Sequence, residues 1–281
     1  GVHRVEVGQR GKRCKGDSVA EAALFLKRLG TRKIADFRWL DVPEPEREQE
    51  AEELLKRLGA VDSSGSLTKA GEEMARFPMH PRLARLVLAG LELGCAGEVL
   101  FVAACISGEG IFMRGDRGAK WIDYLEGEPG WKNDFGGEWL ALLEAQRVDF
   151  SPQACTGLGV LARGARETWK SYLQFVKIME KRGIRVKDPD FRQRGEDCAR
   201  ALLLAFGDRL AVRRDAGTAV CHVIGKRRGK MHAKSAVRQS SVFLAAEIME
   251  VEGRERVVGL SRCVAIDEAW LEELFPGEVV G

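Results

Sequence analysis

The sequence predicts a mainly α-helical protein whose last part changes to short β-strands. Apolar residues recur at helical spacing through most of residues 19–206, whereas beyond that point they form short runs separated by turn residues. Helices followed by a run of strands are typical of two architectures joined in sequence. We therefore expect a helical region followed by a small barrel or sandwich of about 75 residues.

Three helices and a turn are expected in the first part of the chain. The spacing predicts helices over 19–29 and 46–58, each ended by a glycine, and the second has an acidic outer face. Segment 60–68 indicates a short apolar stretch, a turn and a helix cap at Thr68, before a helix that runs through Phe77. Two helices, a β-turn and a further helix fit a small winged-helix unit.

A helical hairpin and several longer helices come next. Residues 81–93 and 96–106 are strongly periodic on either side of Gly94, which predicts an antiparallel pair. The Gly-rich, polar stretch 107–137 predicts a long loop with one short helix. Further helices are expected over 138–148, 163–182 and 199–206, and the stripe of Trp169, Leu173, Val176 and Met179 or Ile178 is interpreted as core packing.

The last segments carry the strand signal. Short apolar runs at 210–212, 219–224, 242–248 and 257–260 predict strands, and a final helix extends from its N-cap Asp267 to Leu274.

Composition places the chain among folded proteins. Its 281 residues can form one large domain or two to three small ones, and 45% hydrophobic with 31% charged residues argues against disorder. No apolar run reaches the roughly 18 residues of a membrane span, and the start, Gly1-Val2-His3-Arg4, shows no secretory signal. We expect a cytoplasmic protein without a membrane partner, present here as a fragment or a processed chain.

The seven cysteines predict reduced thiols. Their number is odd and no Cys-x-x-Cys occurs, which is untypical of a zinc site or a disulfide framework. Cys95 and Cys105 fall on apolar helical stripes and are expected in the core. Cys221, His222 and His232 could ligate a metal, but the prediction is that the chain holds none.

Motifs of known chemistry are missing. Residues 11–18 have the Gly-x-x-x-x-Gly spacing of a phosphate-binding loop, but Asp17 stands where a lysine should neutralise phosphate. Ser66 and Lys69 have the Ser-x-x-Lys spacing of some acyl-transfer enzymes without the motifs that accompany it. We interpret them as a turn followed by the cap at Thr68. No catalytic residue and no ATPase site is predicted on this chain.

A basic cluster is the main charge asymmetry. Residues 213–238 carry a net charge of +7, whereas the whole chain carries only +3. Such a field attracts a polyanion, and scarce aromatic residues nearby predict phosphate contacts with little base specificity. We expect its densest part, 225–230, to be a hairpin tip; the alternative is a solvated, charged turn. The predicted nucleic-acid-binding residues are Arg213, Arg214, Lys226, Arg227, Arg228, Lys230, Lys234 and Arg238. Arg10, Lys12, Arg13 and Lys15 form a second basic group, which we interpret as a flexible arm.

The string from Leu58 to Ala84 resembles the helicase-associated region of the DEAH/RHA helicases. It reads Leu-Gly-Ala-Val-Asp, then Gly-Ser-Leu-Thr, Met-Ala and Pro-Arg-Leu in the family's order. Segments 37–43, 93–95 and 103–107 look like neighbouring family elements, and 265–276 is similar to the C-terminus of the bacterial HrpB-type branch.

The resemblance implies a winged helix, a ratchet-like helical bundle and an OB-like barrel. We place them at residues 19–78, 79–190 and 191–281, after a basic segment of uncertain role at 1–18. It also implies two RecA-like motor domains, in cis or in trans, which use ATP and Mg²⁺ and have no counterpart in this sequence. Gln9-Arg10 and Arg13 faintly echo the family's ATP-sensing arginine motif, but Lys12 replaces its glycine.

The leading hypothesis is therefore an accessory region of an ATP-dependent RNA helicase that binds and guides single-stranded RNA or DNA for its motor. The alternative is a protein-interaction module whose basic hairpin binds an acidic partner. A free-standing hydrolase would rest on Ser66 and Lys69 alone.

Overall fold

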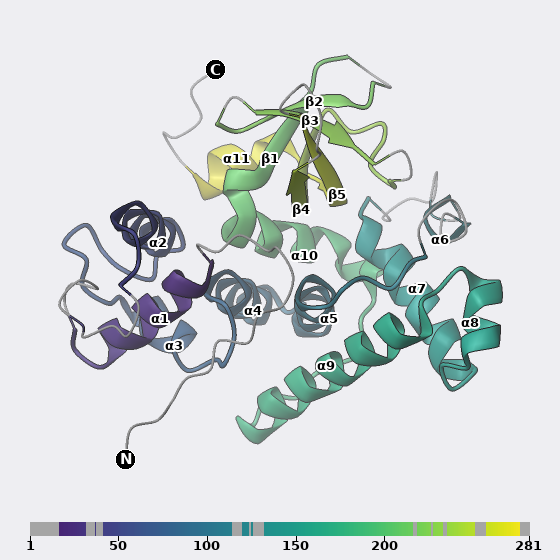
Figure 1. Ribbon diagram of the computed structural model, residues 1–281, viewed down its shortest axis with the longest axis horizontal. Coiled ribbons are helices and arrows are strands. Elements are labelled where there is room, and N and C mark those ends of the chain that lie inside the picture. Colours follow the sequence, from purple (N-terminus) through teal and green to yellow (C-terminus); the bar gives the residue numbers. More distant parts are fainter. Residues whose placement is uncertain are drawn as a thin grey trace. The chain divides into compact units, whose positions relative to one another are not determined.

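The computed structural model describes residues 17–31, 37, 42–113, 120–123, 125, 132–215, 218–225, 227–232, 235–250 and 257–275. The chain divides into two compact units, Gly1–Arg85 and Leu86–Gly281 (Figure 1). The predicted fold class, mainly α-helical with a C-terminal barrel, is confirmed. The predicted boundary at 190/191 lies inside the second unit.

The first unit holds α1 (Asp17–Arg28), α2 (Pro45–Arg57) and α3 (Lys69–Met74). A bridge between Val61 and Leu67 closes a turn before α3. The predicted cap is confirmed, because the Thr68 side chain accepts a hydrogen bond from the Gly71 N–H. The helix over 46–58 is confirmed within one residue at each end.

Lys27 of α1 bonds to α2 and to the turn between Val61 and Leu67. Its side chain is buried, and its ammonium group lies 2.9 Å from a Glu52 carboxylate oxygen and donates to the Gly65 carbonyl oxygen at 3.0 Å. Because a buried ammonium must be paired, these partners fix α1, α2 and the turn as one packed group.

Helix α4 (Pro81–Leu93) runs across the boundary at Arg85, and the remaining helices belong to the second unit. They are α5 (Ala96–Ser107), α6 (Lys120–Asp123), α7 (Asp134–Arg147), α8 (Pro152–Leu158), α9 (Ala162–Lys181), α10 (Phe191–Phe206) and α11 (Glu268–Leu274). Both halves of the predicted hairpin are confirmed, as is the N-cap at Asp267.

Several helix predictions need correction. Helix α8 was not expected, α7 begins four residues early, and α10 begins eight residues early. Asn133 explains the start of α7, because its side chain accepts from the Gly136 N–H at 2.8 Å. All three helices contain glycine, which weakens the helical pattern in the sequence.

The core of the helical layer is aromatic. Phe101 of α5 packs edge-on against Trp139, Tyr172 and Phe191, which come from α7, α9 and α10. The predicted stripe on α9 is only partly in this core, because Met179 is fully buried whereas Leu173 is 47% exposed. Cys95 and Cys105 are buried, as predicted.

The C-terminal strands form a closed barrel in the order β1-β2-β3-β5-β4. They are β1 (Leu210–Arg213), β2 (Val220–Val223), β3 (Arg227–Met231), β4 (Val242–Glu250) and β5 (Val257–Ala265). Only β3 and β5 pair in parallel among these strands. Phe243, Leu260 and Cys263 are among the residues that fill its interior.

Helix α10 joins the helical layer to the barrel. It contacts α5 and also β4, and α7 contacts β5. Figure 1 accordingly shows α10 between the barrel and the helix pair α5 and α9. The second unit is therefore one layered body with continuous packing from α9 to the barrel.

Candidate nucleic-acid interface

The basic residues of β3 lie on the outer surface of the barrel. Side chains alternate across a strand, so Arg228 and Lys230 are exposed whereas Gly229 and Met231 between and after them are buried. The register pairs Arg228 with His222 and Lys230 with Val220 of β2. Both β2 partners are exposed.

Two rows of side chains therefore cross the outer surface. One row runs Val212, His222, Arg228 and Val257, and the other runs Val220, Lys230, Gly259 and Met249. Successive strands are about 4.8 Å apart, and residues two apart on a strand are separated by about 7 Å. We call Val212, Val220, His222, Arg228 and Lys230 the barrel outer face.

Gly229 lies at the inward position of β3 between Arg228 and Lys230. A Cβ at this position would lie 2.6 Å from Cδ1 of Leu260 and 3.0 Å from Cγ2 of Val223. The inward position between Arg228 and Lys230 is thus already filled by the core. A glycine there lets β3 pack closely on its neighbours.

The predicted hairpin tip at 225–230 is corrected. The turn is at Ile224 and Gly225, where Gly225 has φ of 85°, and strand β3 already begins at Arg227. The segment has the charged, glycine-containing composition of a loop. However, the exposed Arg228 and Lys230 alternate with the buried Gly229 and Met231, as in a half-buried strand. The cations are therefore held at fixed strand positions.

Arg213 differs from its predicted place. Its side chain is 7% exposed and points into the barrel, where Nη2 donates to the Val237 carbonyl at 3.2 Å and Nε to the Ser240 carbonyl at 3.1 Å. Nη1 donates to the Thr218 carbonyl. Because its donors are used by the protein, Arg213 belongs to the barrel core.

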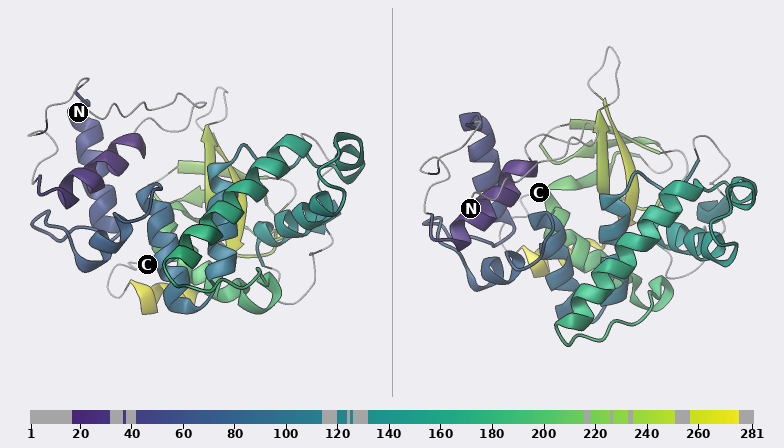
Figure 2. Two further views of the ribbon diagram at one scale, coloured as in Figure 1. Left: turned by 90° about the horizontal axis from the view of Figure 1, so that it is seen from below. Right: turned by 60° about the horizontal axis from the view of Figure 1, so that its bottom comes forward.

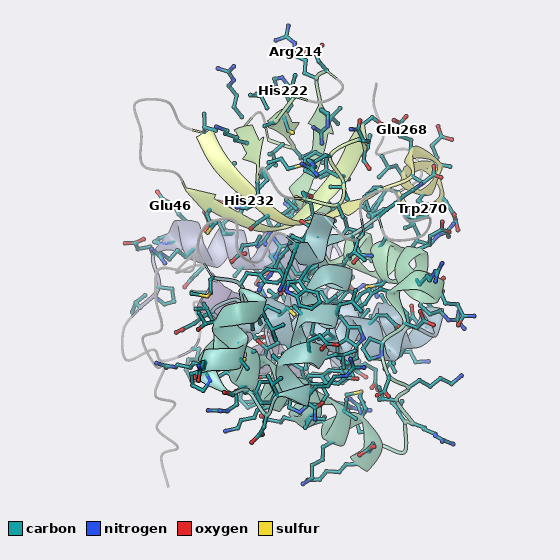
Figure 3. The ribbon with its side chains drawn as sticks, turned by 90° about the vertical axis from the view of Figure 1, so that its right-hand side faces the viewer. Glu46, Arg214, His222, His232, Glu268 and Trp270 are labelled. Carbon is teal, nitrogen blue, oxygen red and sulfur yellow. The ribbon has the colours of Figure 1, made fainter. Side chains whose placement is uncertain are left out.

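The other predicted cations vary in position. Arg214 is exposed, and Figure 3 shows Arg214 and His222 projecting from the barrel into solvent. Arg238 is half-buried in the turn before β4. The backbone of Arg227 begins β3, but its side chain lies outside the described residues, as do Lys226 and Lys234 and the basic group at 10–15.

The possible metal ligands are not brought together. Cys221 is buried and His222 is exposed, because neighbouring residues of β2 point to opposite sides. Among the described residues, no group of three His, Cys, Asp or Glu side chains could hold a metal. Burial also raises the pKa of the Cys221 thiol, which disfavours the thiolate that a metal needs.

Apolar side chains share the barrel surface. Val212, Val220, Ile224 and Met249 are between 41% and 53% exposed. Exposed apolar groups beside cations can contact nucleobases or a protein partner. The periodic pattern alone could not reveal them, because each belongs to a run that also supplies core residues.

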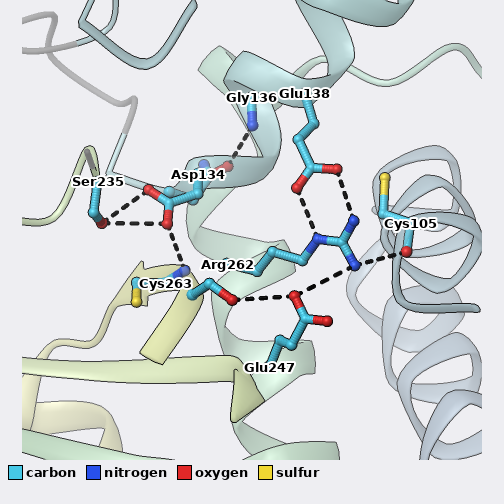
Figure 4. Close-up of polar contacts among 10 residues, drawn as sticks. Cys105, Asp134, Gly136, Glu138, Ser235, Glu247, Arg262 and Cys263 are labelled. Carbon is cyan, nitrogen blue, oxygen red and sulfur yellow. Dashed lines mark hydrogen bonds and ion pairs between the residues drawn. The ribbon is translucent and has the colours of Figure 1, made fainter. Parts of the chain in front are cut away.

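Two buried polar clusters anchor the barrel on the helices (Figure 4). The Asp134 carboxylate at the start of α7 accepts from the Cys263 N–H at 2.7 Å, the Ala236 N–H at 2.8 Å and the Ser235 hydroxyl at 2.9 Å. Burial raises the pKa of Asp134 to about 6, although these hydrogen bonds favour its ionised form.

Arg262 of β5 forms the second cluster. Its guanidinium group pairs with both Glu138 oxygens and donates to the Cys105 carbonyl at 2.7 Å. Arg262 has φ of 53°, in the left-handed region that an arginine adopts only when its surroundings enforce it. The two clusters therefore hold the barrel in one orientation on α5 and α7.

Sequence analysis missed a second basic surface, on α9. Helix α9 contains five Lys and Arg against two Glu, and three further cations just beyond its end bring the net charge of residues 162–187 to +6. The signal was present in the composition but was spread over five helical turns, so no short window stood out.

Among the helices that the structure describes, none is long and apolar enough to cross a lipid bilayer.

Comparison with family models identifies the middle of the chain. Residues 51–79 match the winged-helix part of the helicase-associated domain (HA2), and residues 80–128 match its ratchet-like part. The two matches adjoin and contain the whole string from Leu58 to Ala84 that suggested the resemblance. Residues 51–128 are therefore similar to the winged-helix and ratchet-like parts of a helicase-associated domain, which occurs in DEAH-box helicases.

Proposed function

We propose that this chain is an accessory region of an ATP-dependent DEAH-box RNA helicase and guides single-stranded nucleic acid for its motor. The observation that carries the proposal is the pair of adjoining helicase-associated matches within a chain that also has a basic barrel. RecA-like motor domains, in cis or in trans, would supply ATP hydrolysis with Mg²⁺. On the sequence resemblance, we assign the parent protein to the bacterial HrpB-type branch. The reduced thiols expected from the cysteine pattern support a cytoplasmic location.

In this proposal the barrel outer face holds the strand. Arg228 and Lys230 would neutralise phosphates, and the rows that contain them give the backbone contacts a fixed spacing. The apolar side chains of Val212 and Val220 would contact bases without reading their edges, so binding has little sequence preference. No residue of the chain performs chemistry in this role.

A filter-binding titration with a single-stranded RNA across salt concentrations tests the proposal. In the Arg228→Ala/Lys230→Ala variant, the slope of log affinity against log salt should become shallower by about 2, because each lost phosphate contact removes about one unit. The matched control is Lys56→Ala/Lys69→Ala, which removes two exposed cations from the first unit. Affinity that does not depend on salt, or equal slopes for the two variants, would contradict the proposal.

The second candidate function is a protein-interaction module. It is favoured by the four exposed apolar side chains on the barrel, because apolar contacts are worth most against a protein surface that excludes water. Poly-anionic RNA competes with an acidic partner only if both use the barrel outer face. A partner that stays bound in excess RNA, while the alanine variant releases it, would favour this second function.

A further inference from the structure

Helix α9 presents a straight row of cations on the side opposite the core. Its buried residues include Gly164, Ala165, Thr168, Tyr172 and Met179. The α9 stripe consists of Arg163, Arg166, Lys170, Lys177 and Lys181, all of which are exposed. With 3.6 residues per turn, these five positions lie within about 60° of one another and extend over about 27 Å.

The lysines of the α9 stripe are available to a ligand. Among the described residues, no carboxylate lies within 4 Å of the ammonium groups of Lys170, Lys177 or Lys181. Arg163 pairs with Glu167 at 3.0 Å, and Arg166 donates to the Phe150 carbonyl at 3.2 Å. The three lysines therefore supply most of the uncompensated charge, and long lysine side chains adapt to phosphates at several positions.

We infer that the α9 stripe binds the phosphate backbone of duplex nucleic acid. Single strands gain affinity by stacking bases on aromatic side chains, and the α9 stripe has none. The aromatic groups beside the stripe are covered: Phe150, whose ring centroid lies 5.8 Å from Cζ of Arg166, is buried, and Trp169 is half-buried and stacks on Trp139 with ring centroids 6.2 Å apart. A duplex needs no such platform, because its phosphates are already exposed and regularly spaced.

This surface is separate from the barrel outer face. Helix α9 contacts α5 and α7, and the barrel is reached from them through α10, which contacts β4, and through α7, which contacts β5. Other helices therefore lie between α9 and the barrel strands. Seen from below, α9 crosses in front of the other helices of its unit (Figure 2, left). A nucleic acid on the α9 stripe would therefore leave the barrel free for a second contact.

The inference is tested by fluorescence anisotropy with a blunt RNA duplex of about 16 base pairs, long enough to cover the stripe, and with one of its single strands. The variant is Lys170→Gln/Lys177→Gln, because glutamine keeps helix propensity and removes charge. The matched control is Lys56→Gln/Lys69→Gln, with two exposed lysines of the first unit. Circular dichroism and the melting temperature verify that both variants fold.

We expect the α9 variant to lose at least about tenfold in duplex affinity at low salt, with a salt slope shallower by about 2. Its single-strand affinity should match that of the control. The Arg228→Ala/Lys230→Ala variant should show the reverse pattern, which separates this inference from the proposed function. Equal duplex affinity in the α9 variant and the control overturns it. So does a wild-type protein that binds poly-glutamate but not the duplex, because the stripe would then be a site for an acidic protein.

Discussion

Arg262 and Glu138 form a bidentate ion pair in the interior of the second unit, with Nε 2.8 Å from Oε1 and Nη2 3.2 Å from Oε2. One residue comes from β5 and the other from α7, 124 positions apart. Burial and the Glu138 charge act in opposite directions on the guanidinium, and the net effect raises its pKa. The guanidinium is thus charged in the folded protein.

Replacing only one residue of the Arg262–Glu138 pair should lower the free energy of unfolding. We expect Arg262→Met to destabilise the protein by about 3–5 kcal/mol, because it leaves the Glu138 carboxylate buried and unpaired. The double variant Arg262→Met/Glu138→Leu should recover most of that loss. Urea denaturation measures both, and Arg147→Met, at the exposed Arg147–Glu144 pair, is the control, with an expected effect below about 1 kcal/mol. A double variant as unstable as the single one would contradict this account.

The buried Asp134 predicts a pH dependence of stability. Its pKa is raised to about 6 in the folded protein from an ordinary value of 3.8, so the folded state binds the proton more tightly. The titration of Asp134 therefore adds to the free energy of unfolding below about pH 4, and this contribution is lost as the pH rises through about 6.

Asp134→Asn should remove that dependence. Relative to the wild type, the variant should gain up to about 3 kcal/mol between about pH 4 and pH 7, from the linkage of about 1.4 kcal/mol per pKa unit. Free energies of unfolding at several pH values measure it. Because all other groups titrate in both proteins, a difference that stays constant with pH would show that Asp134 keeps an ordinary pKa.

Substitutions of the neighbouring residues Arg213 and Arg214 should distinguish an effect on stability from an effect on RNA binding. Arg213→Met removes the buried guanidinium that donates to the carbonyl oxygens of Thr218, Val237 and Ser240, so we expect a loss of about 2–4 kcal/mol. Arg214→Met, at an exposed position, should change stability by less than about 0.5 kcal/mol. Chemical denaturation and RNA titration check the pair. If the Arg213→Met protein is as stable as the wild type but binds RNA more weakly, Arg213 contacts the RNA and does not serve the barrel core.

Gly71 should be intolerant of any side chain. A Cβ there would lie 2.0 Å from the Ala60 carbonyl oxygen, which already accepts from the Thr68 N–H. We expect Gly71→Ala to cost about 2–3 kcal/mol, because backbone must shift. Gly157→Ala in α8 is the control, since nothing lies within 4 Å of its Cβ and alanine favours a helix by about 1 kcal/mol. Thermal unfolding compares them, and equal melting temperatures would refute the steric argument.

Periodicity predicted most of the fold, because long elements with one buried face repeat their pattern several times. Helix α4 is an example, found over its expected range. Helix α5, whose residues 97–105 are all buried, and the four predicted strands were located by their apolar runs, and β5 extends five residues beyond its expected end. Helix α8 was missed because its seven residues contain only one fully buried apolar side chain, Cys155. A helix of about two turns with one buried residue has no period to detect.

The candidate site was predicted less completely than the fold. Charge counts located Arg228 and Lys230, but only the strand register shows that they share one side of β3. Counts could not show that Arg213 faces inward, since a guanidinium among carbonyls and a guanidinium in solvent have the same sequence signature. The α9 stripe needed both a helical projection and the knowledge of which face packs on α5.

Alternation along β2 and β3 has a consequence for how such proteins diverge. Inward residues such as Cys221, Gly229 and Met231 are constrained by the barrel interior, so exchange there impairs folding. Outward residues such as His222 and Arg228 can change without that cost. Selection on the ligand and selection on the fold therefore act on interleaved but separate positions. Related chains should keep the residues at Cys221, Val223, Gly229 and Met231 and vary those at His222, Arg228 and Lys230 as their ligands differ.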